Sequence, residues 1–501
     1  MSKTDNKNAL TKRSDDYSQW YLDVIAAADL AEHSPVKGCM VIKPYGYAIW
    51  ENIQKVLDQK IKATGHQNAY FPLFVPKSFL SREASHVKGF AKECAVVTHH
   101  RLINDPASDG VMVDPAAKLE EELVVRPTSE TIIYAMYSKW IKSWRDLPLL
   151  INQWANIVRW EMRTRLFLRT TEFLWQEGHT VHATEQEAED EARKILDLYK
   201  GFTEEYLAMP VIQGQKSESE KFAGALRTYC IEAMMQDGRA LQAGTSHHLG
   251  QNFAKAFNIQ FTDQDGTLKY AWQTSWGVST RLIGALIMCH SDDKGLVLPP
   301  EIAPIKVVIV PIGKTQEEKK LVEDKIGELL IGFKSVDPDF DARRVYDRRE
   351  DLTPGYKFNE WEKKGVPIRI EIGPKDVAAN QLVAVYRDNG EKEAISLAGN
   401  WVALLKKRLD DIQQRLFERA KARLNEDSYR FDDYDKFKSQ LAENPGFIYS
   451  HWCGSDKCEA EIAAETKATI CCIPFDTAAE TGKCIKCNSS SQKRVIFAKA
   501  Y

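Results

Sequence analysis

The sequence lacks any long hydrophobic run. It has 501 residues, and its longest apolar stretches, such as residues 305–312, are far shorter than the ~20 residues that a membrane-spanning helix needs. The first twenty residues are polar and contain no apolar segment of the kind found in secretory signals. We therefore expect no membrane segment and a cytoplasmic location.

The sequence also lacks a strong excess of either charge. The net charge is -3 at pH 7, with 28% charged and 44% hydrophobic residues, which is the mixture of a globular enzyme. Proteins that coat nucleic acid without specificity are usually strongly basic, so any nucleic-acid binding here must use local patches. The length predicts more than one domain.

Glycine-rich nucleotide-binding loops are missing as well. Gly313-Lys314-Thr315 follows an apolar run, but a phosphate-binding loop needs a further glycine where this chain has Val308. If the protein binds a nucleotide, arginines are an alternative, because their planar donor forks match pairs of phosphate oxygens. Arg159 and Arg281 are candidates from distant segments. Taken singly, an arginine is more often a surface or ion-pair residue, so spacing by itself does not make this case.

Cysteines are sparse until the end of the chain, where six of the ten lie at or beyond Cys453. Cys453 and Cys458 form one closely spaced pair, and Cys484 and Cys487 form another. Four thiolates can surround zinc tetrahedrally and leave no open position, which predicts a structural zinc site. Unmetallated thiols are the alternative. We predict that the adjacent cysteines at 471–472 are core residues, and no histidine pair has the spacing of a zinc protease.

Hydrophobic periodicity predicts an α/β organisation. We expect a helix at 48–63, a strand at 68–75 and a helix at 184–207 that begins with the capping box Thr184/Glu187. Beyond a boundary at 298–300, we expect strands at 305–312, 342–346, 366–372 and 381–386, helices at 315–333 and 355–364, and a long charged helix at 400–425. These elements suggest three domains, at 1–300, 301–405 and 406–501.

Three segments resemble the signature motifs of class II aminoacyl-tRNA synthetases: residues 48–75, the Arg159-Trp160-Glu161 segment with a return strand at 167–176, and residues 277–284 with Arg281. Residues 126–130, 167–179 and 242–250, the cysteine-rich end and the final Tyr501 resemble the prolyl-tRNA synthetase family in its archaeal and eukaryotic-like form. The resemblance implies an α/β multidomain protein. The domains that it implies are an antiparallel-sheet catalytic domain, an α/β anticodon-binding domain and a small zinc-binding α+β domain.

The resemblance also implies substrates and roles. L-proline is expected between Thr128/Glu130 and His247, because its protonated amine needs both an acceptor and a counter-charge. Phe173, Trp175 and Phe222 are its expected walls, unless they are plain core. Arg159 is expected to bind the proline carboxylate and the α-phosphate, and Arg281 the γ-phosphate. Further ATP contacts are expected from Glu161, Arg169, Gln242, Thr245 and Ser279. ATP, Mg²⁺, structural Zn²⁺, tRNA(Pro) and a homodimer complete the expectation.

Residues 343–358 carry a basic patch with interleaved aromatic residues, formed by Arg343, Arg344, Tyr346, Arg348, Arg349, Tyr356, Lys357 and Phe358. Such a patch suits unpaired anticodon bases, but nearby acidic residues also fit a plain solvated face. The second and third class II motifs are too close in sequence for the editing domain that the bacterial form inserts there, so we expect no such domain.

Three rival interpretations remain open: a class II synthetase for threonine or histidine, an inactive zinc-containing RNA-binding paralogue, and a nonribosomal adenylating enzyme. The presence of Arg159, Glu161 and Arg281 argues against the second, and the anticodon-like domain argues against the third.

Overall fold

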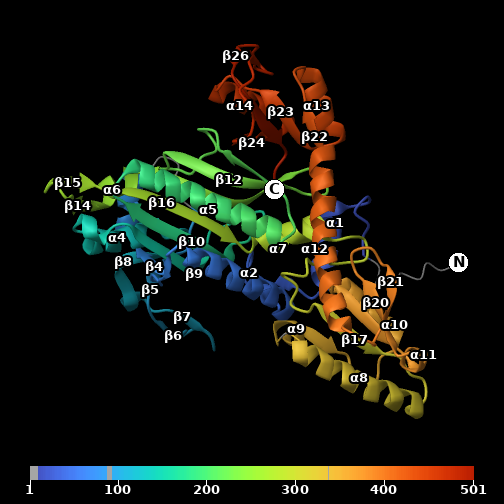
Figure 1. Ribbon diagram of the computed structural model, residues 1–501. Helices are drawn as coiled ribbons and strands as arrows, with labels where there is room; N and C mark the ends of the chain where they lie inside the picture. Colours follow the sequence, from blue (N-terminus) through green and yellow to red (C-terminus); the bar gives the residue numbers. More distant parts are fainter. Residues whose placement is uncertain (1–9, 87–92, 337) are drawn as a thin grey trace.

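The computed structural model describes residues 10–86, 93–336 and 338–501 (Figure 1). The first nine residues, which belong to the stretch searched for a signal, lie outside this range. No helix in the described part of the chain is both long and apolar enough to cross a membrane.

One large sheet organises most of the molecule. Its strand order is β22-β23-β27-β24-β11-β12-β13-β16-β10-β9-β3. The catalytic part consists of β3 (Gln67–Asn68), β9 (Leu149–Val158), β10 (Glu172–His182), β11 (Val211–Gln215), β12 (Arg227–Met234), β13 (Ala240–Gly250) and β16 (Trp272–Ser279). Neighbouring strands from β11 to β9 are antiparallel. The predicted antiparallel catalytic sheet is confirmed.

Helix α5 (Glu185–Glu205) packs against this sheet, mainly on β13, β16 and β12. It begins as predicted, with Thr184 and Glu187 forming a capping box. Its apolar stripe, which includes Ile195, Leu196, Tyr199 and Phe202, belongs to the main core. Helices α1 (Tyr17–Ala27), α2 (Pro44–Ala63) and α7 (Arg281–His290) contribute to the same core.

The strand predicted at 68–75 is wrong as a single element. The structure has β3 at Gln67–Asn68 and β4 at Phe74–Pro76, with irregular chain between them. Pro72 cannot donate a ladder hydrogen bond, and here the chain leaves the large sheet for a smaller one. The smaller sheet contains β4, β8 (Lys118–Val125) and β5 (Val96–His99). A hairpin of β6 (Leu102–Asn104) and β7 (Val111–Val113) lies beyond it (Figure 1).

The second unit has a five-stranded sheet of order β18-β17-β19-β20-β21. Its strands are β17 (Val307–Pro311), β18 (Arg344–Tyr346), β19 (Ile368–Ile372), β20 (Gln381–Tyr386) and β21 (Lys392–Ser396), accompanied by α8 (Gln316–Val336), α9 (Pro338–Ala342), α10 (Pro354–Lys363) and α11 (Pro374–Ala378). The first three strands are mutually parallel, and β20 and β21 are antiparallel. The α/β prediction is confirmed, although β21 was not foreseen.

Helix α12 (Trp401–Glu426) runs from the second unit to the C-terminal unit (Figure 1). The predicted boundary at 405/406 falls inside this continuous helix, and the three-domain division remains a prediction.

The C-terminal unit contains β22 (Ser428–Arg430), α13 (Tyr434–Glu443), β23 (Phe447–His451), α14 (Asp456–Thr466), β24 (Thr469–Pro474), β25 (Gly482–Lys483), β26 (Ser490–Ser491) and β27 (Arg494–Ala498). Strand β24 pairs with β11 through Gly214 and Gln215, so this unit extends the catalytic sheet. The chain ends beside β13, where the Tyr501 N–H donates to the Ala240 carbonyl (3.0 Å).

Candidate active site

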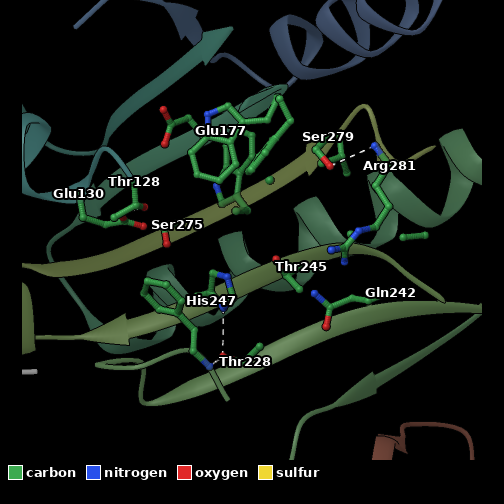
Figure 2. Close-up of a pocket in the computed structure, with 18 of the residues that line it drawn as sticks. Thr128, Glu130, Glu177, Thr228, Gln242, Thr245, His247, Ser275, Ser279 and Arg281 are labelled. Carbon is green, nitrogen blue, oxygen red and sulfur yellow. Dashed lines mark hydrogen bonds between the residues drawn. The ribbon is translucent and has the colours of Figure 1, made fainter. Parts of the chain in front are cut away.

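A cavity of about 320 Å³ opens over the central strands of the large sheet (Figure 2). Its walls come from β10, β12, β13 and β16, from the start of α4 (Glu130–Trp140), and from the start of α7. Figure 2 shows Thr128, Glu130 and His247 toward one end, and Gln242, Thr245, Ser279 and Arg281 toward the other. Arg159 also lines this cavity. Segments far apart in the sequence therefore meet in one space.

The two arginines predicted from sequence both face this space. Arg159 Nε donates to the Pro127 carbonyl (2.8 Å), and its guanidinium lies 5.7 Å from the Phe173 ring and 5.5 Å from the Trp175 ring. Arg281 is the first residue of α7, and its Nε donates to the Leu168 carbonyl (3.2 Å). A helix start adds partial positive charge, so the Arg281 end favours an anion.

Carboxylates of the described residues do not neutralise the two guanidinium charges at this site by ion pairing. Among the described residues, no ion pair involves Arg159 or Arg281. Arg281 is partly buried, Arg159 is exposed, and both line the cavity. Burial lowers the pKa of Arg281, and the nearby charges of Arg169 and Arg159 lower it further. Partly desolvated positive charges that repel one another are stabilised by a multivalent anion.

The opposite end carries carboxylates. Glu130 is the first residue of α4, where the helix dipole favours a negative charge. It is 4% exposed and accepts a hydrogen bond from the Thr128 hydroxyl. This end therefore offers an anionic acceptor to a small cationic group.

Glu177 and His179 lie beside Glu130 and form a buried pair, with Glu177 Oε2 2.9 Å from His179 Nε2. Ser129 Oγ (2.5 Å) and Gln153 Nε2 (2.7 Å) also donate to Glu177. Burial alone would raise the pKa of Glu177, but these hydrogen bonds and the charge of His179 lower it below its usual value. The pair was not assigned a role from sequence. The available signal was their spacing of two on a strand, which puts both on one face.

His247 lines the same end of the cavity. Burial, followed by the charges of His179 and Arg159, lowers its pKa to about 3. Its Nδ1 lies 3.0 Å from the Thr228 hydroxyl, and the Phe222 ring stacks on the imidazole with centroids 4.6 Å apart. Phe173, Trp175 and Phe222, expected as pocket walls, all line the cavity.

Glu161 and Arg169 are the predicted site residues that do not line the cavity. They pair with each other, with Arg169 Nε 3.7 Å from Glu161 Oε2. Glu161 also accepts from the Arg163 backbone N–H (2.8 Å). Arg169 is nevertheless close enough to Arg281 to lower its pKa. Both residues therefore lie beside the cavity, engaged with one another.

The four predicted zinc ligands come together in the C-terminal unit. The sulfur atoms of Cys453, Cys458, Cys484 and Cys487 all lie within 4.8 Å of one another. Two of these separations are 3.8 and 3.7 Å. Thiolates placed tetrahedrally at the usual Zn–S distance of about 2.3 Å would be about 3.8 Å apart. The geometry therefore fits zinc. Cys471 and Cys472 are buried outside this cluster, as predicted.

The predicted basic patch of the second unit is partly neutralised. Lys357 is buried beside Asp347 (3.6 Å), and Arg349 pairs with Asp347 (2.6 Å) and Glu360 (2.8 Å). Arg348 lies over the Tyr346 ring at 4.9 Å, and both residues line a cavity of about 430 Å³. Acidic residues therefore neutralise part of the basic patch, as the sequence suggested. Arg348 and Tyr346 nevertheless still line a cavity.

An antiparallel sheet with an arginine-lined cavity defines the class II tRNA synthetase core. The family model described as "tRNA synthetase class II core domain (G, H, P, S and T)" matches residues 113–290. "Anticodon binding domain" matches residues 306–408, and "Prolyl-tRNA synthetase, C-terminal" matches residues 434–501.

The chain is also similar along its length to proteins named proline–tRNA ligase. The chain is 57% identical over 492 residues to the proline–tRNA ligase of Cytophaga hutchinsonii, and 58% identical over 494 residues to that of Porphyromonas gingivalis. It is 55% identical over 495 residues to that of Amoebophilus asiaticus. Each alignment covers 98% of this chain and 99% of the relative. The chain belongs to the prolyl-tRNA synthetase family.

Proposed function

We propose that this enzyme activates L-proline with ATP, forming prolyl-adenylate and pyrophosphate, and transfers the prolyl group to the 3′ end of tRNA(Pro). The observation that carries the proposal is the polarity of one cavity. It has a carboxylate at one end, and along the rest it has two arginines that form no ion pair with any described residue. Proline presents a cation and an anion on one small ring, and ATP presents the further negative charge.

At the carboxylate end, Glu130 accepts from the protonated secondary amine and balances its charge, while Thr128 adds a second polar contact. Neutral His247 and the Phe222 ring that stacks on it form an apolar wall for the pyrrolidine ring. Apolar contacts discriminate by only about 1–3 kcal/mol per methylene. We therefore expect measurable activation of alanine or cysteine.

Arg159 is assigned to the middle of the cavity, where it contacts both the proline carboxylate and the α-phosphate. A carboxylate oxygen attacks the α-phosphorus as the bond to pyrophosphate breaks. The charge that develops there is stabilised by the guanidinium donors. No general base is required, because the proline carboxylate is already ionised at neutral pH. Positioning accounts for much of the remaining rate enhancement.

Arg281 is assigned to the γ-phosphate, with Gln242, Thr245 and Ser279 as further ATP contacts beside it. Glu161 and Arg169 are assigned to the adenine and phosphates, which requires them to leave their mutual ion pair when ATP enters. Mg²⁺ bound to the phosphates would supply additional positive charge. No residue is assigned as its ligand.

The second unit is proposed to bind the anticodon, and the stacked Tyr346 and Arg348 are suited to an unpaired base. The cysteine cluster is proposed to hold a structural Zn²⁺.

The three predicted domains, 1–300, 301–405 and 406–501, are retained as a proposal. A homodimer through the segment at 48–75 and a cytoplasmic location, where tRNA is charged, are also proposed. Light scattering of the purified protein tests the dimer.

We also propose that the enzyme has no editing domain of the inserted kind. Between Glu161 and Arg281 the chain forms β10, α5, β11, β12, β13 and β16 of the core, together with α6 (Asn252–Phe257), β14 (Gln260–Thr262) and β15 (Leu268–Tyr270). Core elements take up most of this stretch, which supports the proposal. Purified alanyl-tRNA(Pro) should therefore survive incubation with the enzyme, and rapid hydrolysis would contradict the proposal.

The test of the main proposal is proline-dependent exchange of pyrophosphate into ATP, followed by charging of tRNA(Pro). Exchange without charging of tRNA(Pro) would mean that the enzyme forms prolyl-adenylate but does not transfer the prolyl group. Absence of both would end the proposal.

A further inference from the structure

The cavity has a wall that belongs to a loop rather than to the sheet. This wall loop, residues 216–226, connects β11 to β12 and supplies Glu220 and Phe222 to the cavity lining. The Phe222 backbone N–H donates to Thr228 Oγ1 (2.9 Å), and the same hydroxyl lies 3.0 Å from His247 Nδ1. The wall loop therefore completes the end of the cavity assigned to the imino acid.

The start of the wall loop is held by the C-terminal unit. Ser217 Oγ donates to Glu459 Oε1 (2.7 Å), and Ser219 Oγ donates to Glu459 Oε2 (2.7 Å). Glu459 lies on α14, directly after Cys458 of the cysteine cluster. Ser217 is 2% exposed and Glu459 is 4% exposed. Burying a carboxylate is costly unless it is hydrogen-bonded, so these contacts define one position of the loop.

A second set of contacts, made by Lys216, holds the wall loop next to Ser217. Lys216 Nζ donates to Glu232 Oε1 on β12 (2.7 Å) and to the carbonyl of Cys471 on β24 (2.6 Å). The base of the wall loop is thereby fixed to both the catalytic sheet and the C-terminal unit. Glu459 is different because its partners are side chains of the loop itself, so its removal frees the loop without disturbing the sheet.

The serines held by Glu459 are close in sequence to the two residues that line the cavity. The backbone N–H groups of Glu220 and Lys221 donate to the Ser217 carbonyl (3.2 and 3.0 Å), forming a turn. Glu220 follows Ser219 directly, and Phe222 is two residues further on. Where Ser217 and Ser219 are held therefore determines where the two cavity-lining side chains lie.

We propose that Glu459 is a positioning residue for amino-acid binding: it holds Ser217 and Ser219 so that Glu220 and Phe222 close the proline end of the cavity. The inference rests on the proposed function. It gives the C-terminal unit a role in substrate binding, although no residue of that unit lines the cavity in the described part of the chain.

The test uses the full-length enzyme and pyrophosphate exchange, with KM measured separately for proline and for ATP. Glu459→Ala should raise KM for proline about tenfold, equivalent to about 1.4 kcal/mol. KM for ATP and the metal content should stay at parental values. Glu459→Gln should be less affected, because its amide can still exchange hydrogen bonds with both hydroxyls. The control, Glu461→Gln, changes a half-exposed carboxylate on the same helix and should behave as the parent.

Removing the partners supplies independent variants. The double substitution Ser217→Ala with Ser219→Ala should reproduce the proline effect, and adding Glu459→Ala to it should cause no further loss. An unchanged KM for proline in Glu459→Ala would overturn the inference. Equal losses for proline and ATP together with a lower thermal midpoint would overturn it too, because they indicate a structural contact only. If the parent enzyme shows no proline-dependent exchange, the proposed function itself fails.

Discussion

Replacing Arg159 by alanine should remove the principal charge from the middle of the cavity. Within the described part of the chain the guanidinium makes one hydrogen bond, from Nε to the Pro127 carbonyl, so its remaining donors can serve a ligand. Loss of one preorganised donor to a developing oxyanion typically costs about 100- to 1000-fold in kcat, or about 2.7–4 kcal/mol. Arg159 is assigned to two anionic groups, so we expect the rate of exchange to fall by about 100-fold or more.

The fold should survive this change. The substitution loses one hydrogen bond to a carbonyl and the contacts with the Phe173 and Trp175 rings, each worth about 1 kcal/mol. Arg159→Lys keeps the charge but loses the planar fork, so it should recover only part of the activity. Arg145→Ala, which removes an arginine stacked on Trp144 away from the cavity, is the control.

The assay is proline-dependent pyrophosphate exchange at saturating ATP and proline, with circular dichroism to confirm folding. Normal exchange in Arg159→Ala would refute the role assigned to this arginine. An equal loss in Arg145→Ala would show that the effect is not specific to the cavity.

Other predictions concern separate parts of the molecule. Arg281→Ala should abolish exchange while the protein stays folded, and retained exchange would remove its phosphate role. Cys484→Ser should abolish zinc binding measured by elemental analysis and lower the thermal midpoint, whereas full zinc content would exclude this residue as a ligand. Gly178→Ala places a Cβ 2.1 Å from the Trp276 ring. It should cost about 1–3 kcal/mol of unfolding free energy, measured in urea, and an unchanged midpoint would contradict the packing. Burial lowers the pKa of His290 to about 3. The unfolded chain therefore binds more protons below about pH 6.5, and stability should fall by up to about 1.4 kcal/mol per pH unit as the pH decreases. His290→Gln should reduce the loss in thermal midpoint between about pH 7 and about pH 5, and an unchanged pH dependence would argue against this residue.

Local patterns predicted much of the fold. The strand at 381–386 has the predicted bounds, and α5 begins at its predicted capping box. These segments can be recognised in the sequence by their apolar periodicity and their side-chain caps. Strand β21 was missed because its residues are mostly charged or exposed on a sheet edge. The break at residues 69–73 was missed because it depends on the chain changing sheets, which is a tertiary event.

The sites differ in how much of them the sequence contained. The cysteine cluster followed from spacing alone, because the two members of each pair are only a few residues apart in the sequence. The cavity did not, because Thr128, Arg159, His247 and Arg281 come from separate segments of the chain, and only a family resemblance related them. The contact between Ser217 and Glu459 spans 242 positions and has no local signature, so it required the structure.

The central claim is that the cavity binds an imino acid beside ATP, and an exchange assay with each of the twenty amino acids tests it most directly. We predict that L-proline supports by far the fastest exchange of pyrophosphate into ATP, with only weak exchange for alanine or cysteine. Faster exchange with threonine, histidine or any other amino acid, or no exchange at all, would contradict it.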